Sequence, residues 1–462
     1  MNGRGFTPHT EEEVAEMLSF IGINSIDELF EVIPEVIRLD RELNFAMAMS
    51  EADVIDEFDR IGRNNKANSD LVCFAGGGAY DHDISYATRS LAGRSEFVTA
   101  YTPYQPEVSQ GVLQAVFEFQ TLISRLVELP ITNASLYDGA SALVEAVNLG
   151  VAQSGNNRVF VSKAVNPNWR AVLRTFAKGS GHDIIEIDLT NGVTNWDSII
   201  SLDSSDKVLT ESSMQLPGVV VVSYPNYFGC LEDVEGLRSW ANRIGALFVV
   251  VYDPVASGVL IPPGALGADI AVGEGQAFGT ALSFGGPYLG LFSCKQELVR
   301  RLPGRLVGET LDSNGRSAYV TTLRAREQDI RREKASSNVC TNQTLMAVTC
   351  AIQMSWLGRQ GLKELAKRCI NATNFLRSRV LEVDDIFALS DAPHVRDFAI
   401  SLPVTADVII ERMAEEGFLA GIALGPQMES DEYSNVLLVS ATEKRTLREI
   451  ETYVELMRKV IK

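Results

Sequence analysis

Two polar residues that follow consecutive apolar segments predict a site at one edge of a sheet. Asp253 comes directly after the apolar run 246–252, which is typical of a fully buried parallel strand. A second short apolar segment ends at Gly273-Glu274-Gly275-Gln276. A carboxylate at the end of a buried strand needs a partner to offset its desolvation. The sequence therefore predicts a polar site that contains Asp253 and Gln276.

The chemistry of this spacing depends on a lysine that is absent. Pyridoxal-phosphate enzymes of the aspartate-aminotransferase type pair a strand-end Asp with the pyridinium nitrogen of the cofactor, and a Lys after the next strand forms the Schiff base. Here no lysine lies between Lys207 and Lys295, and Gln276 stands where the amine is expected. An amide is not a nucleophilic amine, so Gln276 cannot form a Schiff base. We expect a cofactor-enzyme scaffold without its covalent anchor, in which Asp253 binds a pyridinium or an arginine, or caps the turn at Pro254.

Small residues before a predicted helix form a second part of the candidate site. Asp138, Gly139, Ala140 and Ser141 precede the apolar segment 143–147. A helix that begins with small residues presents free backbone N–H groups at its positive end, where phosphate binds well. On spacing alone a simple Asp138 N-cap is the favoured interpretation. The position of this segment ahead of Asp253 and Gln276 favours a phosphate site.

Asn226 and Tyr227 follow another apolar strand, 219–224. In open α/β sheets, ligands bind at the carboxyl ends of the strands, which places both residues in the expected region. The Pro225-Asn226 dipeptide is equally typical of a turn.

The elements that must position these residues alternate between strand and helix. A long amphipathic helix is expected over 110–129, and strands are expected at 158–162, 184–187, 219–224 and 246–252. This alternation predicts an α/β fold with a doubly wound, mostly parallel sheet.

Beyond residue 340 the pattern changes and predicts a small C-terminal α/β domain. It comprises two long helices, strands near 396–402 and 435–440, and a closing helix begun by Thr442 and Glu443. We therefore expect an N-terminal helical arm (1–69), a large domain (70–335) and the small domain (336–462). Within the arm, two capping boxes predict short helices, Thr10 with Glu13 and Ser25 with Glu28.

Residues 70–110, the first part of the large domain, form a connector that is rich in Gly, Pro and Tyr, with little periodicity. A long structureless segment in a compact protein favours a binding or interface role. His82 in this connector is a candidate for ring stacking or acid–base work, and the plainer interpretation is an interface residue.

Composition excludes several classes of function. The chain has 462 residues, a formal net charge of −19 and 46% hydrophobic residues. The negative charge argues against a nucleic-acid partner, which needs a basic surface. No apolar run approaches the ~20 residues of a membrane span, and the N-terminus lacks the apolar core of a signal peptide. Six scattered cysteines without a CxxC pair argue against a metal site and, with no export signal, predict a cytoplasmic location.

Segments along the whole chain, taken in order, resemble one family. The matching stretches are Pro8-His9-Thr10, 78–82, 100–111, 133–140, 273–276, 285–288, 326–328, Asn342-Gln343 and 442–446. Each is weak alone, but their order and spacing are specific. The sequence resembles the N-terminal half, or the separate α subunit, of the P-protein of the glycine cleavage system.

The resemblance implies a fold-type-I pyridoxal-phosphate scaffold and a partner. The implied β subunit carries the Schiff-base Lys and the pyridoxal phosphate, and the implied assembly is α2β2. The implied reaction is decarboxylation of glycine, followed by transfer of the aminomethyl group to the lipoyl arm of the H-protein. In this chain Asp138, Gly139, Ala140, Ser141, Asn226, Asp253 and Gln276 then form a vestigial cofactor pocket. By analogy with fold-type-I dimers, the connector lends Tyr101, Thr102, Tyr104 and Gln105 to the partner's site.

Two other interpretations remain open at this point. The chain could be a self-sufficient pyridoxal-phosphate enzyme that uses a lysine from elsewhere, such as Lys163 or Lys295. It could also be a non-catalytic scaffold or regulatory subunit whose old pocket is empty or filled by side chains.

Overall fold

The computed structural model describes residues 8–39, 41–203, 216–326 and 328–462 and divides into two compact units, Met1–Lys66 and Ala67–Lys462. Among its described residues, the first unit has two α-helices, α1 (Glu11–Ile21) and α2 (Glu51–Gly62), and neither has a buried residue. The capping box of Thr10 and Glu13 at the start of α1 is confirmed, whereas α2 was not predicted.

The second predicted capping box in this unit is wrong. Residues Ile26–Phe30 form a 3₁₀ turn, and the Ser25 side chain makes no cap hydrogen bond. The carboxylate of Glu28 instead accepts a hydrogen bond of 2.9 Å from the backbone N–H of Asn24. This earlier bond removes the carboxylate from the position that a capping box requires.

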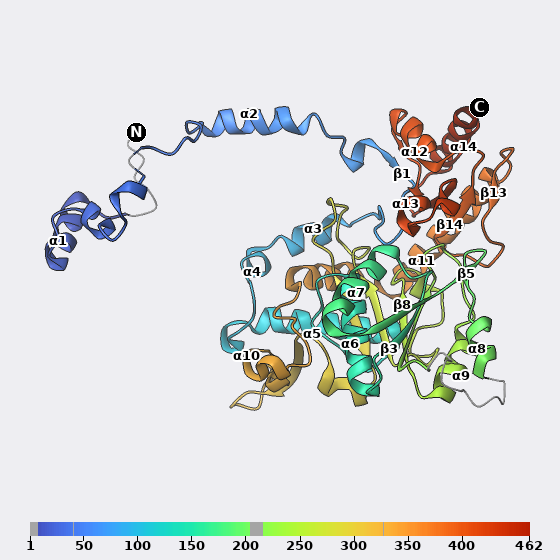
Figure 1. The fold of residues 1–462 in the computed structure, drawn as a ribbon, viewed down its shortest axis with the longest axis horizontal. Coiled ribbons are helices and arrows are strands. Elements are labelled where there is room, and N and C mark those ends of the chain that lie inside the picture. Colours follow the sequence, from blue (N-terminus) through green and yellow to red (C-terminus); the bar gives the residue numbers. More distant parts are fainter. Residues whose placement is uncertain (1–7, 40, 204–215, 327) are drawn as a thin grey trace. The chain divides into compact units, whose positions relative to one another are not determined.

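A seven-stranded sheet forms the centre of the second unit (Figure 1). Its strand order is β2-β10-β9-β8-β7-β3-β4, and within it only β10 runs antiparallel to its neighbours. The strands are β2 (Ile131–Thr132), β3 (Arg158–Ser162), β4 (Asp183–Ile187), β7 (Val219–Tyr224), β8 (Leu247–Tyr252), β9 (Ile270–Glu274) and β10 (Gly290–Cys294). The predicted doubly wound, mostly parallel sheet is confirmed. The carboxyl ends of β7, β8 and β9 therefore share one edge.

Helices cover both faces of this sheet because successive strand residues point to opposite sides. Val159 and Val161 of β3 pack with α6 (Gly139–Ser154) and α7 (Pro167–Ser180), while Phe160 packs with α9 (Val234–Ile244) on the other face. Helix α5 (Gln110–Val127) packs against the long helix α11 (Thr344–Val380), which is interrupted at Gly358.

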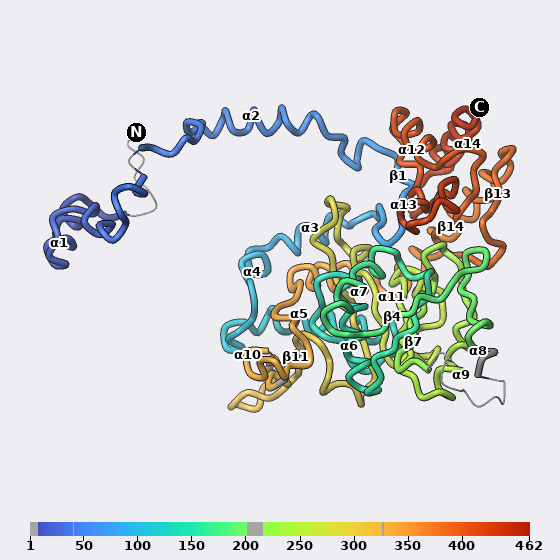
Figure 2. Tube along the Cα trace, viewed as in Figure 1, coloured from blue at the N-terminus to red at the C-terminus, as the bar shows by residue number. Residues whose placement is uncertain are grey.

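The C-terminal residues form a second lobe of the same unit, coloured orange to red in Figure 2. Its four strands are antiparallel in the order β13-β14-β17-β16: β13 (Phe387–Ala388), β14 (Asp397–Ser401), β17 (Val436–Ser440) and β16 (Ile422–Ala423). Helices α12 (Ala406–Glu415) and α14 (Leu447–Ile461) pack on them. The short strand β1 (Val72–Cys73) pairs with β15 (Phe418–Leu419), which ties the connector to this lobe.

The predicted start of the closing helix is wrong. Helix α14 begins at Leu447, with Thr446 and Glu449 as its capping box. Thr442 and Glu443 lie outside the helix because their side chains bond to the connector: the Thr442 hydroxyl donates to the carbonyl of Asp81, and Glu443 accepts from the backbone N–H of Asp83.

The connector is less irregular than predicted. It contains two short helices, α3 (Tyr86–Ala92) and α4 (Ser95–Val98), before an extended stretch that leads to α5. The domain boundaries at residues 69/70 and 335/336 stay predictions.

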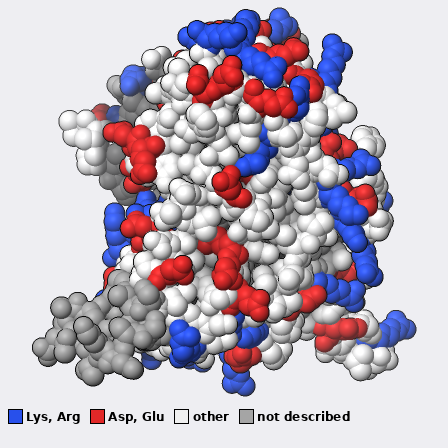
Figure 3. All heavy atoms as spheres, turned by 90° about the vertical axis from the view of Figure 1, so that its right-hand side faces the viewer, with Lys and Arg blue, Asp and Glu red and all other residues white. Residues whose placement is uncertain are grey.

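Acidic and basic side chains are interspersed on the face shown in Figure 3. Among the helices that the structure describes, none has the length and apolar character of a membrane span.

Candidate functional site

A small cavity lies at the carboxyl ends of β7, β8 and β9. It has a volume of about 80 Å³, and its lining includes Asn226, Asp253, Gln276 and Tyr227. None of residues 138–141 lines it. The structure thus brings together three members of the predicted pocket and leaves the helix N-terminus behind other side chains.

Asp253 is fully engaged by groups of this chain. One carboxylate oxygen accepts from the backbone N–H groups of Val255 and Ala256, at 2.8 and 3.2 Å. The other accepts from Nη2 of Arg396 at 2.5 Å. The sequence left three possible partners for Asp253: a pyridinium, an arginine or the turn at Pro254. In the structure, Asp253 binds both the turn and an arginine.

Arg396 precedes strand β14 and enters the site from the C-terminal lobe. Its side chain is 3% exposed, and the guanidinium lies 3.3 Å from the ring centroid of Tyr80, a cation–π contact. Tyr80 in turn donates its hydroxyl to Asp397 at 2.9 Å. A guanidinium and an aromatic ring therefore stand beside Asp253, where a pyridinium would need to lie.

Gln276 acts as a clamp between strand β9 and the connector. Its amide oxygen accepts from the backbone N–H of Tyr80 at 2.9 Å, and its amide nitrogen donates to the carbonyls of Tyr80 and Thr280 at 3.1 and 2.7 Å. The residue is 1% exposed. Because both amide groups have partners, Gln276 holds the connector closed over the strand end.

Two acidic side chains occupy the N-terminus of α6. Asp138 caps the helix by accepting from the backbone N–H of Ser141 at 2.7 Å, in agreement with the plainer interpretation. Glu274 accepts from the backbone N–H of Gly139 at 2.9 Å, and also from the N–H groups of Gln276 and Leu289. The Trp169 ring lies so close to Gly139 that an added Cβ would meet it at 2.1 Å. Two of the N–H groups that would attract a phosphate, those of Gly139 and Ser141, thus already have partners.

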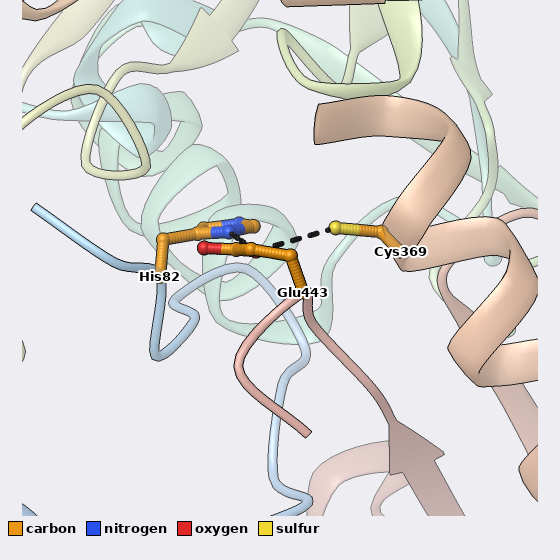
Figure 4. A group of neighbouring side chains, drawn as sticks. All are labelled: His82, Cys369 and Glu443. Carbon is orange, nitrogen blue, oxygen red and sulfur yellow. Dashed lines mark hydrogen bonds and ion pairs between the residues drawn. The ribbon is translucent and has the colours of Figure 1, made fainter. Parts of the chain in front are cut away.

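A second hydrogen-bonded cluster continues from Arg396, and Figure 4 shows its three side chains, His82, Glu443 and Cys369. Nη1 of Arg396 lies 2.6 Å from Nε2 of His82, and Nδ1 of His82 lies 2.7 Å from Glu443. Arginine has only donors, so Nε2 of His82 accepts, and Nδ1 carries the proton that it donates to Glu443. The Cys369 thiol lies 3.5 Å from the same carboxylate. His82 therefore links Arg396 to Glu443 through hydrogen bonds.

Burial and hydrogen bonding have opposite effects on the carboxyls of this region. Burial raises the pKa of Glu274 to about 8, despite three backbone donors. Burial likewise raises the pKa of Asp397 to about 6. For Glu443, burial acts in the same direction, but the hydrogen bonds from His82 and Asp83 outweigh it and bring the pKa to about 2.

The raised pKa of Glu274 predicts a pH dependence of stability. A carboxyl that binds its proton more tightly in the folded chain stabilises the fold fully below its unfolded pKa of 4.5. That contribution is lost as the pH rises through about 8. Between these values, Glu274 should lower the free energy of unfolding by at most about 1.4 kcal/mol per pH unit.

Urea unfolding at pH 5.5 and 7.5, compared between the wild type and Glu274→Gln, measures this contribution. We expect the free energy of unfolding to differ less between the two pH values in Glu274→Gln than in the wild type. In the control Glu455→Gln, where the glutamate is exposed, this difference should equal that of the wild type. An equal pH difference in wild type and Glu274→Gln would contradict the assignment.

The lysines named as alternative anchors lie elsewhere. Nζ of Lys295 lies 2.5 Å from Asp269, which precedes β9, whereas Gln276 follows the other end of that strand. Lys163 pairs with Asp188 and does not line the cavity. Neither amine reaches Asp253.

The four connector residues expected to act on a partner lie apart from this cavity. Tyr101 and Tyr104 are 75% and 56% exposed, and Gln105 is also exposed. The Thr102 hydroxyl is buried without a hydrogen-bond partner among the described residues. Their role in a partner's site stays a prediction.

Sequence reasoning missed Glu274, Tyr80 and Arg396 as site residues. Glu274 is two residues from Gln276, and Arg396 and Asp397 are charged residues at the start of an apolar strand. A charged residue next to a buried strand needs a partner that offsets its desolvation. This requirement could have identified both Glu274 and Arg396 as members of the site.

The sheet order and the strand-end Asp define the class: this is the fold of the type-I pyridoxal-phosphate enzymes. A NifS-like protein from Rickettsia africae shares the fold at 12% identity and a TM-score of 0.59, over 84% of this chain and 99% of that chain. The sphingosine-1-phosphate lyase of Burkholderia pseudomallei shares it at 14% identity and a TM-score of 0.66, over 93% and 94%.

More similar proteins define the family. Residues 4–457 match the family described as Glycine cleavage system P-protein. The chain is 44% identical to the probable glycine dehydrogenase (decarboxylating) subunit 1 of Chlorobium phaeobacteroides, over 97% of this chain and 98% of the relative. The corresponding protein of Macrococcus caseolyticus is 42% identical, over 97% of each. The crystal structure of glycine decarboxylase (P-protein) in inhibitor-bound form is 40% identical, with a TM-score of 0.87 over 98% of this chain and 99% of that chain. The chain belongs to the glycine cleavage system P-protein family.

Proposed function

We propose that this chain is the subunit of a glycine-decarboxylating P-protein that supports catalysis on a partner. The partner is a Lys-bearing β subunit, with two copies of each in the assembly (α2β2). Together they decarboxylate glycine and transfer the aminomethyl group to the lipoyl arm of the H-protein. The observation that carries this proposal is Gln276, clamped to Tyr80 where a cofactor lysine would stand.

The residues present in this chain do not fit pyridoxal phosphate. Arg396 takes the acceptor that a pyridinium would need, and Glu274 takes the N-terminus of α6 that a phosphate would need. The remaining cavity of about 80 Å³ is smaller than the ~300 Å³ or more of ordinary ligand sites. We therefore assign the cofactor to the partner subunit, where it would act as the electron sink for decarboxylation.

This chain's own contribution would come from exposed residues. The connector presents Tyr101, Tyr104 and Gln105, and we assign them, with Thr102, to the partner's substrate site.

Exposed apolar side chains of the first unit support a stable partner. Phe20, Val36 and Met47 are each more than nine-tenths exposed, so the described residues of the first unit itself leave them uncovered. Large apolar side chains without cover are typical of protein interfaces.

The free cysteines of the described residues support a cytoplasmic location.

Reconstitution tests the proposal. The chain, a family β subunit with the lysine, and their mixture are each supplied with pyridoxal phosphate, lipoylated H-protein and carboxyl-labelled glycine. Release of labelled CO₂ should require the mixture. After treatment with borohydride, which reduces a Schiff base to a stable amine, the chain alone should carry no covalently attached pyridoxal phosphate. Decarboxylation by this chain without a partner would overturn the proposal.

The same assay, carried out with variants of the connector residues, distinguishes a scaffold role from a catalytic contribution to the partner's site. If this chain were only a scaffold, such variants would still assemble with the partner and would release CO₂ at the wild-type rate.

A further inference from the structure

A second cavity, of about 500 Å³, lies beside Tyr104 and is lined by three arginines. Arg305 precedes β11 (Leu306–Leu311), Arg324 belongs to a 3₁₀ turn (Arg324–Arg326), and Arg332 begins another (Arg332–Lys334). The other lining residues are Gln328, Asp329, Glu333, Asn338, Val339 and Cys340. Among the lining residues that the structure describes, three cations stand against two carboxylates, a positive excess in a chain whose net charge is −19.

Arg305 is the buried cation of the cavity and is 9% exposed. Its Nη2 donates to the carbonyl of Cys340 at 3.1 Å, and its guanidinium lies 5.1 Å from the ring centroid of Tyr104. Its Nη1 is buried and has no hydrogen-bond partner among the residues that the structure describes. No described carboxylate forms an ion pair with it. A buried charge with an unused donor is costly, and an oxyanion would supply the missing acceptor.

The two other arginines are available to the same ligand. Arg324 is 3.6 Å from Asp329, but both side chains are about half exposed, so this pair holds the guanidinium weakly. Asn338 and Gln328 add neutral amide donors. Arginine presents its donors as a planar fork that matches the oxygens of carboxylate and phosphate.

We propose that this cavity binds an oxyanion, the carboxylate or phosphate of a small molecule, through Arg305 with Arg324 and Arg332. Its volume is within the range of small-molecule sites. The proposal does not rest on the proposed function, because the site is built from this chain alone. Tyr104 lines this cavity and is also one of the connector residues that we assign to the partner's substrate site. If the chain assembles with a partner, the bound anion would therefore lie near that substrate site.

The test is calorimetric titration of the full chain with inorganic phosphate and, separately, with acetate, at constant ionic strength set by chloride. We expect saturable binding of one probe at one site, with a Kd of about 1 mM or tighter. Preference for phosphate identifies a phosphorylated ligand, and preference for acetate identifies a carboxylate. Arg305→Met should weaken binding about tenfold or more, while Arg316→Met, an exposed arginine outside the lining, should not change it.

Arg324→Met and Arg332→Met keep the proposal testable if Arg305→Met fails to fold. Each should weaken binding several-fold, because each removes one cation from the cavity. Absence of saturable binding of both probes to the wild-type chain would overturn the inference. Equal binding by the wild type and these variants would overturn it as well.

Discussion

Replacing Arg396 by methionine is expected to destabilise the second unit by about 3–5 kcal/mol, the usual effect of removing one partner of a buried ion pair. The variant would leave the Asp253 carboxylate without its cation and Nε2 of His82 without its donor. It would also remove the guanidinium that packs against the Tyr80 ring. Urea unfolding followed by circular dichroism measures the loss.

A second change should recover part of this stability. In the double variant Arg396→Met with Asp253→Asn, no charge is left unpaired at this pair, and the new amide keeps an oxygen for the backbone N–H groups. The matched control is Arg448→Met on the exposed side of α14, which should change the free energy of unfolding by less than about 0.5 kcal/mol. If Arg396→Met were no more destabilising than this control, the ion pair of Arg396 with Asp253 would not stabilise the fold as expected.

Replacing Tyr104 by alanine is expected to lower the kcat of the assembled complex about tenfold to a hundredfold, if the connector positions substrate on the partner. The ring is 56% exposed and packs against Arg305, so its loss should affect the surface of the site more than the core of this chain. The measurement is CO₂ release from glycine by the complex, with co-purification of the two subunits recorded in parallel.

Tyr86→Ala is the matched control, since Tyr86 on α3 is 84% exposed and is not among the residues assigned to the partner's site. It should leave both activity and assembly unchanged. Unaltered activity in Tyr104→Ala, with normal assembly, would favour the scaffold role for this chain.

Local pattern was sufficient to predict most strands of the central sheet, although β2 and β10 were not among those predicted. The runs 158–162 and 219–224 are apolar and β-branched, and their flanking turns and helices leave few alternatives, so β3 and β7 lie where they were expected. The Asp138 cap was equally predictable because its hydrogen bond spans only three residues.

Competing hydrogen-bond partners were not predictable in this way. The Ser25 capping box failed because the Glu28 carboxylate had a second backbone donor within reach. Glu443 was assigned to a helix start, yet it bonds to the connector 360 residues earlier in the chain. Nothing in the local pattern around either residue distinguishes these outcomes.

The sequence by itself determines that residue 276 cannot form a Schiff base, because Gln276 has an amide side chain and an amide is not a nucleophilic amine. The partners of Asp253 and Gln276 were decided only by tertiary structure. Arg396 reaches Asp253 across 143 positions, and Gln276 reaches Tyr80 across 196, when the connector and the C-terminal lobe close on the sheet edge. Those contacts depend on how the lobes pack, and a buried carboxylate accepts whichever cation the packing brings to it.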